Sequence, residues 1–185
     1  MRVSREKAAE NRERIVETAS RLFRDKGFDG VGVDAIMHGA GLTHGGFYGH
    51  FSSKDELAAE AVARALKQNV ESQDRYADLR ELATHYLSDR HCADRVNGCV
   101  IGALGGDMAR QGAGVRRKLA AHVRAQFDRL VGLIKNGTAA RRRQRAIVTF
   151  ATMVGALTLA RAVDDAALSK EILTAAREAL APPKE

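Results

Sequence analysis

The sequence predicts an all-α protein of about nine helices, and three observations support this prediction. Apolar residues, 45% of the chain, recur at spacings that place them on one face of a helix. The only two prolines stand together at 182–183, outside every expected helix. Glycine and polar pairs separate the periodic segments, and no segment alternates as a strand does. We expect a helix-turn-helix domain over residues 1–57, a linking helix to about 71, and a second helical domain over 72–185.

The first two helices have clear boundaries. Residues 4–26 carry a single apolar stripe with charges elsewhere, which is typical of an amphipathic helix. Gly27 is expected to end this helix in the left-handed conformation, with Phe28 packing back onto it. A second helix is expected over 33–39, with Gly32 as its N-cap.

The following segment is the most informative part of the chain, because it combines polar donors with three aromatic rings. A short third helix is expected to begin at Thr43 and end near His50, after a tight turn at Gly41. Ser53 and Glu56 have the spacing of a capping box, in which each side chain bonds the other residue's amide. Two helices joined through a glycine turn predict a helix-turn-helix, whose second helix enters a DNA groove.

Five further helices are expected beyond residue 73, at roughly 75–90, 96–111, 113–135, 139–163 and 168–180. The uncharged run 146–160 is apolar on all sides, so it must be covered on every face. It falls short of the roughly 20 residues that span a bilayer, and no membrane partner is expected. Together with the last helix, it predicts a four-helix bundle between two copies of the chain. A central helix within a monomer is the alternative.

Net charge and cysteine content bear on the binding partner and the cellular location. The net charge is +7, which favours nucleic-acid binding, but residues 1–57 hold nine basic and nine acidic side chains. The excess therefore lies in the second domain, where the basic runs 116–118 and 141–145 are expected to be solvated helix ends. Two cysteines are too few for a disulfide scaffold, so a cytoplasmic location is expected.

A set of residues occurs in a familiar order through the first 57 positions. The set is Arg14-Ile15, Ala19, Leu22-Phe23, Gly27-Phe28, Asp34-Ala35-Ile36, Ala40-Gly41-Leu42, Gly46-Phe47-Tyr48, His50-Phe51, Lys54 and Leu57. On these residues the chain resembles the TetR family of bacterial transcriptional repressors. The resemblance implies a homodimer, a palindromic double-stranded DNA operator and a small-molecule inducer of unknown identity. It implies no cofactor and no enzymatic activity.

The resemblance also implies which residues contact phosphates. Tyr48, His50 and Lys54 are expected to donate to phosphates on either side of the major groove. The family often has hydroxyl residues ahead of the second helix. Here the backbone amide of Gly32 or Val33 must serve instead. For His50, capping the protein core is the alternative role.

Base contacts are expected at the start of the third helix. Thr43 and His44 are predicted to read bases, and Gly45 would allow close approach to base edges. Gly46 would permit close approach to the phosphate backbone. His44 could instead be an idle turn residue. Asp34 is expected to cap the second helix, or alternatively to accept a hydrogen bond from a cytosine amine.

The second domain of such regulators holds a small molecule. The candidate pocket residues are Tyr86, Met108, Phe127, Phe150 and Met153, and plain core is the alternative role of each. A thiol-based redox or electrophile sensor acting through Cys99 is the alternative mechanism, because a helix N-terminus favours thiolate. The residues His85, His91, Cys92 and Cys99 have no tight metal-ligand spacing. No catalytic motif is recognisable, so neither a metal site nor a catalytic site is expected.

Overall fold

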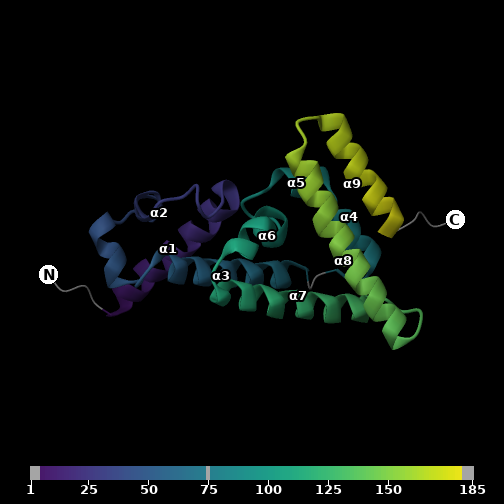
Figure 1. Ribbon diagram of the computed structural model, residues 1–185, viewed down its shortest axis with the longest axis horizontal. Coiled ribbons are helices and arrows are strands. Elements are labelled where there is room, and N and C mark those ends of the chain that lie inside the picture. The colour runs from purple at the N-terminus through teal and green to yellow at the C-terminus, as the bar shows by residue number, and fades with distance from the viewer. Residues whose placement is uncertain (1–4, 74–75, 181–185) are drawn as a thin grey trace.

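The computed structural model describes residues 5–73 and 76–180, and the regular secondary structure of this part of the chain is all helical, without strands (Figure 1). Nine α-helices and one 3₁₀-helix follow one another within these ranges. They are α1 (Arg5–Lys26), α2 (Val33–Gly39), η1 (His44–Gly49), α3 (Lys54–Gln73), α4 (Leu79–Tyr86), α5 (Asp89–Ala93), α6 (Val100–Arg110), α7 (Ala113–Leu133), α8 (Ala139–Ala162) and α9 (Ala166–Leu180). The prediction of an all-α protein is confirmed.

The N-terminal domain gathers α1, α2 and η1 at one end of the molecule, with α1 packed along α3 (Figure 1). Gly27 ends α1 with φ of +76°, and its N–H donates to the carbonyl of Phe23 at 2.8 Å. The ring of Phe28 packs on that of Phe23, with centroids 5.0 Å apart. The predicted end of α1 at Gly27 and the packing of Phe28 back onto this helix are therefore confirmed. The buried core of this domain includes Ile15, Phe23, Ile36, Met37, Phe47, Phe51 and Leu57.

The third helix differs from the expectation, because it is a 3₁₀-helix of six residues. Three of those six residues are glycines, which lower the stability of α-helix, and a 3₁₀ turn is the common form of such short pieces. Thr43 is its N-cap as expected, but the Thr43 side chain makes no capping hydrogen bond. In α2, the inward residues are Ile36 and Met37, and Ala35 is exposed.

The helix expected over 75–90 is divided into α4 and α5. The hydroxyl of Ser88 accepts a hydrogen bond from the N–H of His91 at 3.1 Å, which starts a new helix. A second difference follows, because α6 begins at Val100 and not near 96. The side chain of Asp94 accepts from the N–H of Asn97 at 3.0 Å, and this closed turn replaces the first expected helical turn.

The C-terminal core lies where α8 packs against α7 and α9 (Figure 1). Its fully buried members include Leu130, Ala146, Met153, Leu157 and Leu173. By length and composition α8 would suffice to cross a membrane, but 39% of its most apolar window is buried within the protein. Several large apolar side chains of α8 and α9 remain exposed: Ile147, Val148, Leu159 and Leu168.

Candidate nucleic-acid interface

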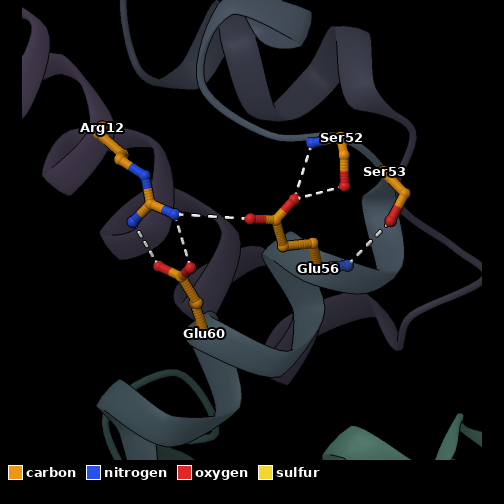
Figure 2. A network of polar contacts seen from close by, with 5 residues as sticks. All are labelled: Arg12, Ser52, Ser53, Glu56 and Glu60. Atoms are coloured by element: carbon orange, nitrogen blue, oxygen red, sulfur yellow. Dashed lines mark hydrogen bonds and ion pairs between the residues drawn. The ribbon is translucent and has the colours of Figure 1, made fainter.

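The turn between η1 and α3 is held by short polar contacts (Figure 2). The hydroxyl of Ser53 accepts from the N–H of Glu56 at 3.1 Å, which is the first half of the expected capping box. The return contact differs by one residue. The Glu56 carboxylate accepts from the N–H of Ser52 at 2.7 Å and from its hydroxyl at 2.6 Å. These bonds lower the pKa of Glu56, and they fix how η1 leads into α3.

An ion pair fastens α1 to α3 beside this turn (Figure 2). The Arg12 guanidinium donates to both carboxylate oxygens of Glu60, at 2.5 and 2.6 Å, and this bond raises the Arg12 pKa. The same guanidinium lies 4.4 Å from the ring centroid of Phe51. Sequence reasoning missed this contact, because the two charged residues are 48 positions apart and each is ordinary in its own helix.

The aromatic residues of η1 separate into core and surface. Phe47 and Phe51 are buried, and their rings stack with centroids 5.8 Å apart. The rings of Tyr48 and Phe47 are nearly perpendicular, with centroids 5.2 Å apart, yet 71% of Tyr48 is exposed. A phenol donor is thus presented outward on a ring whose position the core defines.

Asp34 and His44 form a contact that the sequence did not predict. The carboxylate of Asp34, in the first turn of α2, is hydrogen-bonded to Nδ1 of His44, the first residue of η1. Asp34 makes no capping bond to its own helix; the residue at that N-cap is Gly32. The two elements of the helix-turn-helix are therefore joined on their exposed side.

The glycines of this face divide into two kinds. Gly41 has φ of +68°, and a Cβ there would lie 2.8 Å from the Arg14 guanidinium, so the fold itself requires glycine. Gly32 and Gly45 have ordinary φ, and a Cβ on either would meet nothing within 4 Å. A Cβ on Gly46 would only touch Met37 at 3.5 Å. Nothing inside the described structure demands glycine at position 45.

The remaining predicted contact residues lie nearby. Thr43 is exposed, while Val33 and His50 are partly buried. His50 is the C-cap of η1, and its N–H donates to the carbonyl of Phe47 at 2.9 Å. Lys54, expected to donate to phosphate, donates to the carbonyl of Phe28 at 2.6 Å. An ammonium group has three donors, so this bond positions Lys54 without using all of its hydrogens.

A cavity of about 280 Å³ lies between α3, α4, α5 and the start of α6. Tyr86 and Cys99 are the two predicted residues that line it. Phe127, Phe150 and Met153 pack in the C-terminal core, where the first two rings meet edge to face at 5.8 Å. Met108 lies in the N-terminal core, where α6 reaches the N-terminal domain.

One edge of the cavity joins the two domains through the backbone of Gly98. The Gly98 carbonyl accepts from the side chains of Asn69 at 3.2 Å and Arg24 at 3.4 Å. The Asn69 side-chain oxygen accepts in turn from the N–H of Val100 at 2.9 Å. The start of α6 is thereby bonded to both α1 and α3.

A second group of contacts holds the opposite side of the same loop. Nδ1 of His91 bonds the carbonyl of Tyr86 at 2.6 Å, and Nε2 accepts from the N–H of Cys99 at 3.0 Å. Burial is the main reason that the His91 pKa is lowered. Arg161 of α8 donates to the carbonyls of His91 and Cys92, at 2.8 and 3.0 Å. None of these partners was predicted from the sequence.

Cys99 is the N-cap of α6, and only 5% of the residue is exposed. Its sulfur accepts from the N–H of Gly102 at 3.4 Å. Burial, and then the nearby Cys99 thiol, raise the pKa of Tyr86 well above its ordinary value. Within the described ranges, no three or more His, Cys, Asp and Glu side chains are placed to hold a metal ion.

Residues 15–61, which include the second half of α1, all of α2 and η1, and the start of α3, match the family described as bacterial regulatory proteins, tetR family. The N-terminal domain belongs to the TetR family. The matches to known TetR-type sequences each cover less than half of this chain. The regulator LmrA of Bacillus subtilis is 36% identical over 76 residues, which is 40% of this chain and 39% of LmrA. The chain thus spans less than half the length of the relatives it matches.

Solved structures extend the likeness of fold to the whole chain. A TetR-family regulator from Cytophaga hutchinsonii has a TM-score of 0.76 at 22% identity, and the match covers 100% of both chains. The regulator FadR from Bacillus subtilis, solved in complex with stearoyl-CoA, has a TM-score of 0.60 at 18% identity, and the match covers 89% of this chain and 96% of FadR. At these identities the likeness concerns the fold.

Proposed function

We propose that this protein is a homodimeric transcriptional repressor that binds a palindromic DNA operator and is released by a small molecule. The observation that carries the proposal is the outward face of the TetR-type helix-turn-helix. There, Thr43, His44, Gly45 and Tyr48 are all exposed, on a segment anchored by buried Phe47. An exposed tyrosine and a glycine that the fold does not need both fit a surface made for close contact with another molecule.

The proposed contacts divide between positioning and readout. Tyr48, His50 and Lys54 would donate to phosphates, together with the backbone N–H of Gly32 or Val33. Such contacts fix how the domain lies on DNA but carry no sequence information. Thr43 and His44 would reach base edges, with Gly45 admitting the close approach.

The dimer is proposed to form through α8 and α9. Val148, Gly155 and Leu159 share one face of α8, since they stand seven and four residues apart. Leu168 and Ala175 stand seven residues apart on α9 and therefore also share one face. Val148, Leu159 and Leu168 are between 41% and 57% exposed. Two copies of this pair of helices would cover the apolar face as a four-helix bundle.

The cavity between α3 and α6 is the proposed inducer site. At about 280 Å³ it lies near the lower end of the roughly 300–1,000 Å³ of usual ligand pockets. This volume favours a ligand far smaller than the stearoyl-CoA bound by FadR. Asn69 and Gly98 line the cavity and also bond α3 to α6, so an occupant that displaced them would move α3 and the domain attached to it.

The experiment that tests the function starts from purified protein and a pool of random double-stranded DNA. Repeated selection is expected to recover a palindrome whose half-sites are about one helical turn apart. Tyr48→Ala should weaken binding to every selected variant about equally, because it removes a phosphate contact. Failure to enrich any sequence, with the protein folded, would contradict the proposal.

A thiol-sensing repressor is the second candidate, and the observation that favours it is the place of Cys99 on the cavity wall next to the α5–α6 loop. Oxidation of that sulfur would disturb its bond from Gly102 and the start of α6. Peroxide should then release DNA from the parent protein but not from Cys99→Ser. Equal release from both proteins would remove Cys99 from the mechanism.

A further inference from the structure

We propose that Asp34 is a positioning residue that sets which bases His44 accepts. The inference rests on the proposed function, because it assumes that His44 faces DNA. The carboxylate of Asp34 is bonded to Nδ1 of His44 across the turn between α2 and η1. The two side chains are 83% and 53% exposed, so the contact lies on the outer face of the helix-turn-helix and not in its core.

The bond determines which ring nitrogen carries the hydrogen. An ionised carboxylate can only accept hydrogen bonds, so Nδ1 of His44 must be the donor. In a neutral imidazole the other nitrogen, Nε2, then has no hydrogen and can only accept. Asp34 thus leaves Nε2 as the one ring nitrogen of His44 that is available to DNA, and Nε2 can only accept a hydrogen bond.

An acceptor selects among base edges in the major groove. Adenine and cytosine present amine donors there, whereas guanine and thymine present carbonyl or ring-nitrogen acceptors. His44 held in this state would accept from an adenine or cytosine amine. At the same groove position, guanine or thymine would place an acceptor opposite Nε2 of His44, and no hydrogen bond could form between the two acceptors.

Loss of the carboxylate would release this choice. Without Asp34, the neutral ring of His44 could carry its hydrogen on Nε2 and donate to guanine or thymine. The hydrogen bond of the Asp34 side chain goes to His44 and not to its own helix, and its place in the first turn of α2 adds only a modest interaction with the helix dipole. Its replacement should therefore change the base preference and leave the fold intact.

The first test reads the ring directly, without DNA. Nitrogen NMR of the full chain at pH 8, where imidazoles are ordinarily neutral, should show the His44 hydrogen on Nδ1 in the parent protein. In Asp34→Ala the hydrogen should move toward Nε2. A parent His44 whose hydrogen resides on Nε2 would overturn the inference.

The second test is selection of operators at pH 8 by the parent, Asp34→Ala and Asp34→Asn. Asp34→Ala should lose preference for adenine or cytosine at one symmetric position, by roughly five- to tenfold relative to guanine or thymine. Asp34→Asn should lose less of this preference, because its amide oxygen can still accept from Nδ1 of His44. Asp29→Asn is the matched control: it removes one negative charge from the exposed α1–α2 loop without touching His44. It should change affinity for all operators by a similar factor.

The outcomes separate this inference from the proposed function. If the parent binds an operator and the Asp34 variants keep its base preference at every position, only the role of Asp34 is overturned. If Asp29→Asn shifts the same position equally, the effect is one of net charge and the inference again fails. A folded parent that selects no DNA sequence would overturn both the proposed function and this inference.

Discussion

The backbone N–H of Cys99 donates a 3.0 Å hydrogen bond to Nε2 of His91, and Nδ1 of the same ring bonds the carbonyl of Tyr86. An imidazole with one nitrogen accepting and the other donating is neutral. His91 therefore joins α4 to the start of α6 only while it carries no charge. A proton added at Nε2 would oppose the N–H of Cys99.

This arrangement predicts that stability falls in mild acid. Burial lowers the pKa of His91 below its ordinary value of 6.5, so the unfolded chain binds the proton at a higher pH than the folded one. The contribution of neutral His91 to the free energy of unfolding is complete above about pH 6.5 and is lost as pH falls through the lower pKa of the folded state. Urea denaturation between pH 8 and pH 5 measures this change in the free energy of unfolding.

The matched variants for this prediction are His91→Gln and His122→Gln. Burial also lowers the pKa of His122, so each residue should account for part of the slope. His91→Gln should flatten the dependence of unfolding free energy on pH. An unchanged slope in His91→Gln would contradict the neutral bridging role.

Gly45→Ala should separate the needs of the fold from those of DNA binding. A Cβ at position 45 meets no atom within 4 Å, so stability should be unchanged or higher by up to about 1 kcal/mol. Operator affinity should fall at least several-fold, because the methyl group would occupy space needed by DNA. Gel-shift titration and urea denaturation provide the two readouts.

The control for that variant is Gly106→Ala in α6, where a Cβ also meets nothing within 4 Å. It should affect stability in a similar direction and leave operator affinity as in the parent. If Gly45→Ala binds DNA as tightly as the parent, close approach at η1 is not part of recognition.

The contact between Arg12 and Glu60 should contribute modestly to stability. Both side chains are more than one third exposed, so solvent screening limits the pair to about 1 kcal/mol or less. Arg12→Ala should cost somewhat more than Glu60→Gln, because it also removes the guanidinium from the Phe51 ring. A double-mutant cycle measured by urea denaturation gives the coupling. A coupling near zero would reduce the pair to a passive surface contact.

Leu159→Glu should prevent dimerisation while the chain remains folded. The side chain is 57% exposed, so the monomer tolerates a charge there, whereas a buried unpaired carboxylate in the bundle is costly. Ala121→Glu on the exposed face of α7 is the control and should remain dimeric. Sedimentation of both variants, with circular dichroism for folding, provides the test. A dimeric Leu159→Glu would place the interface elsewhere.

Much of the fold was predictable because local signals determine it. Gly27 ends α1 through a positive φ that glycine adopts readily, and the sequence shows that glycine directly. The division at Ser88 was missed, although serine is a strong N-cap residue, because the apolar pattern continues across it. The conversion of η1 to a 3₁₀-helix depends on how three glycines and the Phe47 anchor compete, which periodicity alone does not reveal.

The site was predictable only in part, for a physical reason. Residues that contact DNA in the proposed function lie within one short segment, so a sequence motif is sufficient to identify them. The contacts of Asn69 and His91 with the α5–α6 loop join residues from different helices, and such pairings depend on tertiary packing. The lining of the cavity also depends on tertiary packing, and of the predicted site residues only Tyr86 and Cys99 line it.

The most direct measurement of the central claim is the affinity and stoichiometry of operator binding for the parent and for Tyr48→Ala. Tyr48 is exposed and rests on the buried Phe47 ring, so the substitution should leave the unfolding free energy nearly unchanged. The expected result is two chains per palindrome for the parent, with Tyr48→Ala binding every operator variant more weakly. A folded Tyr48→Ala that binds as tightly as the parent, or a parent that binds as a single copy, would contradict recognition by a paired η1 segment.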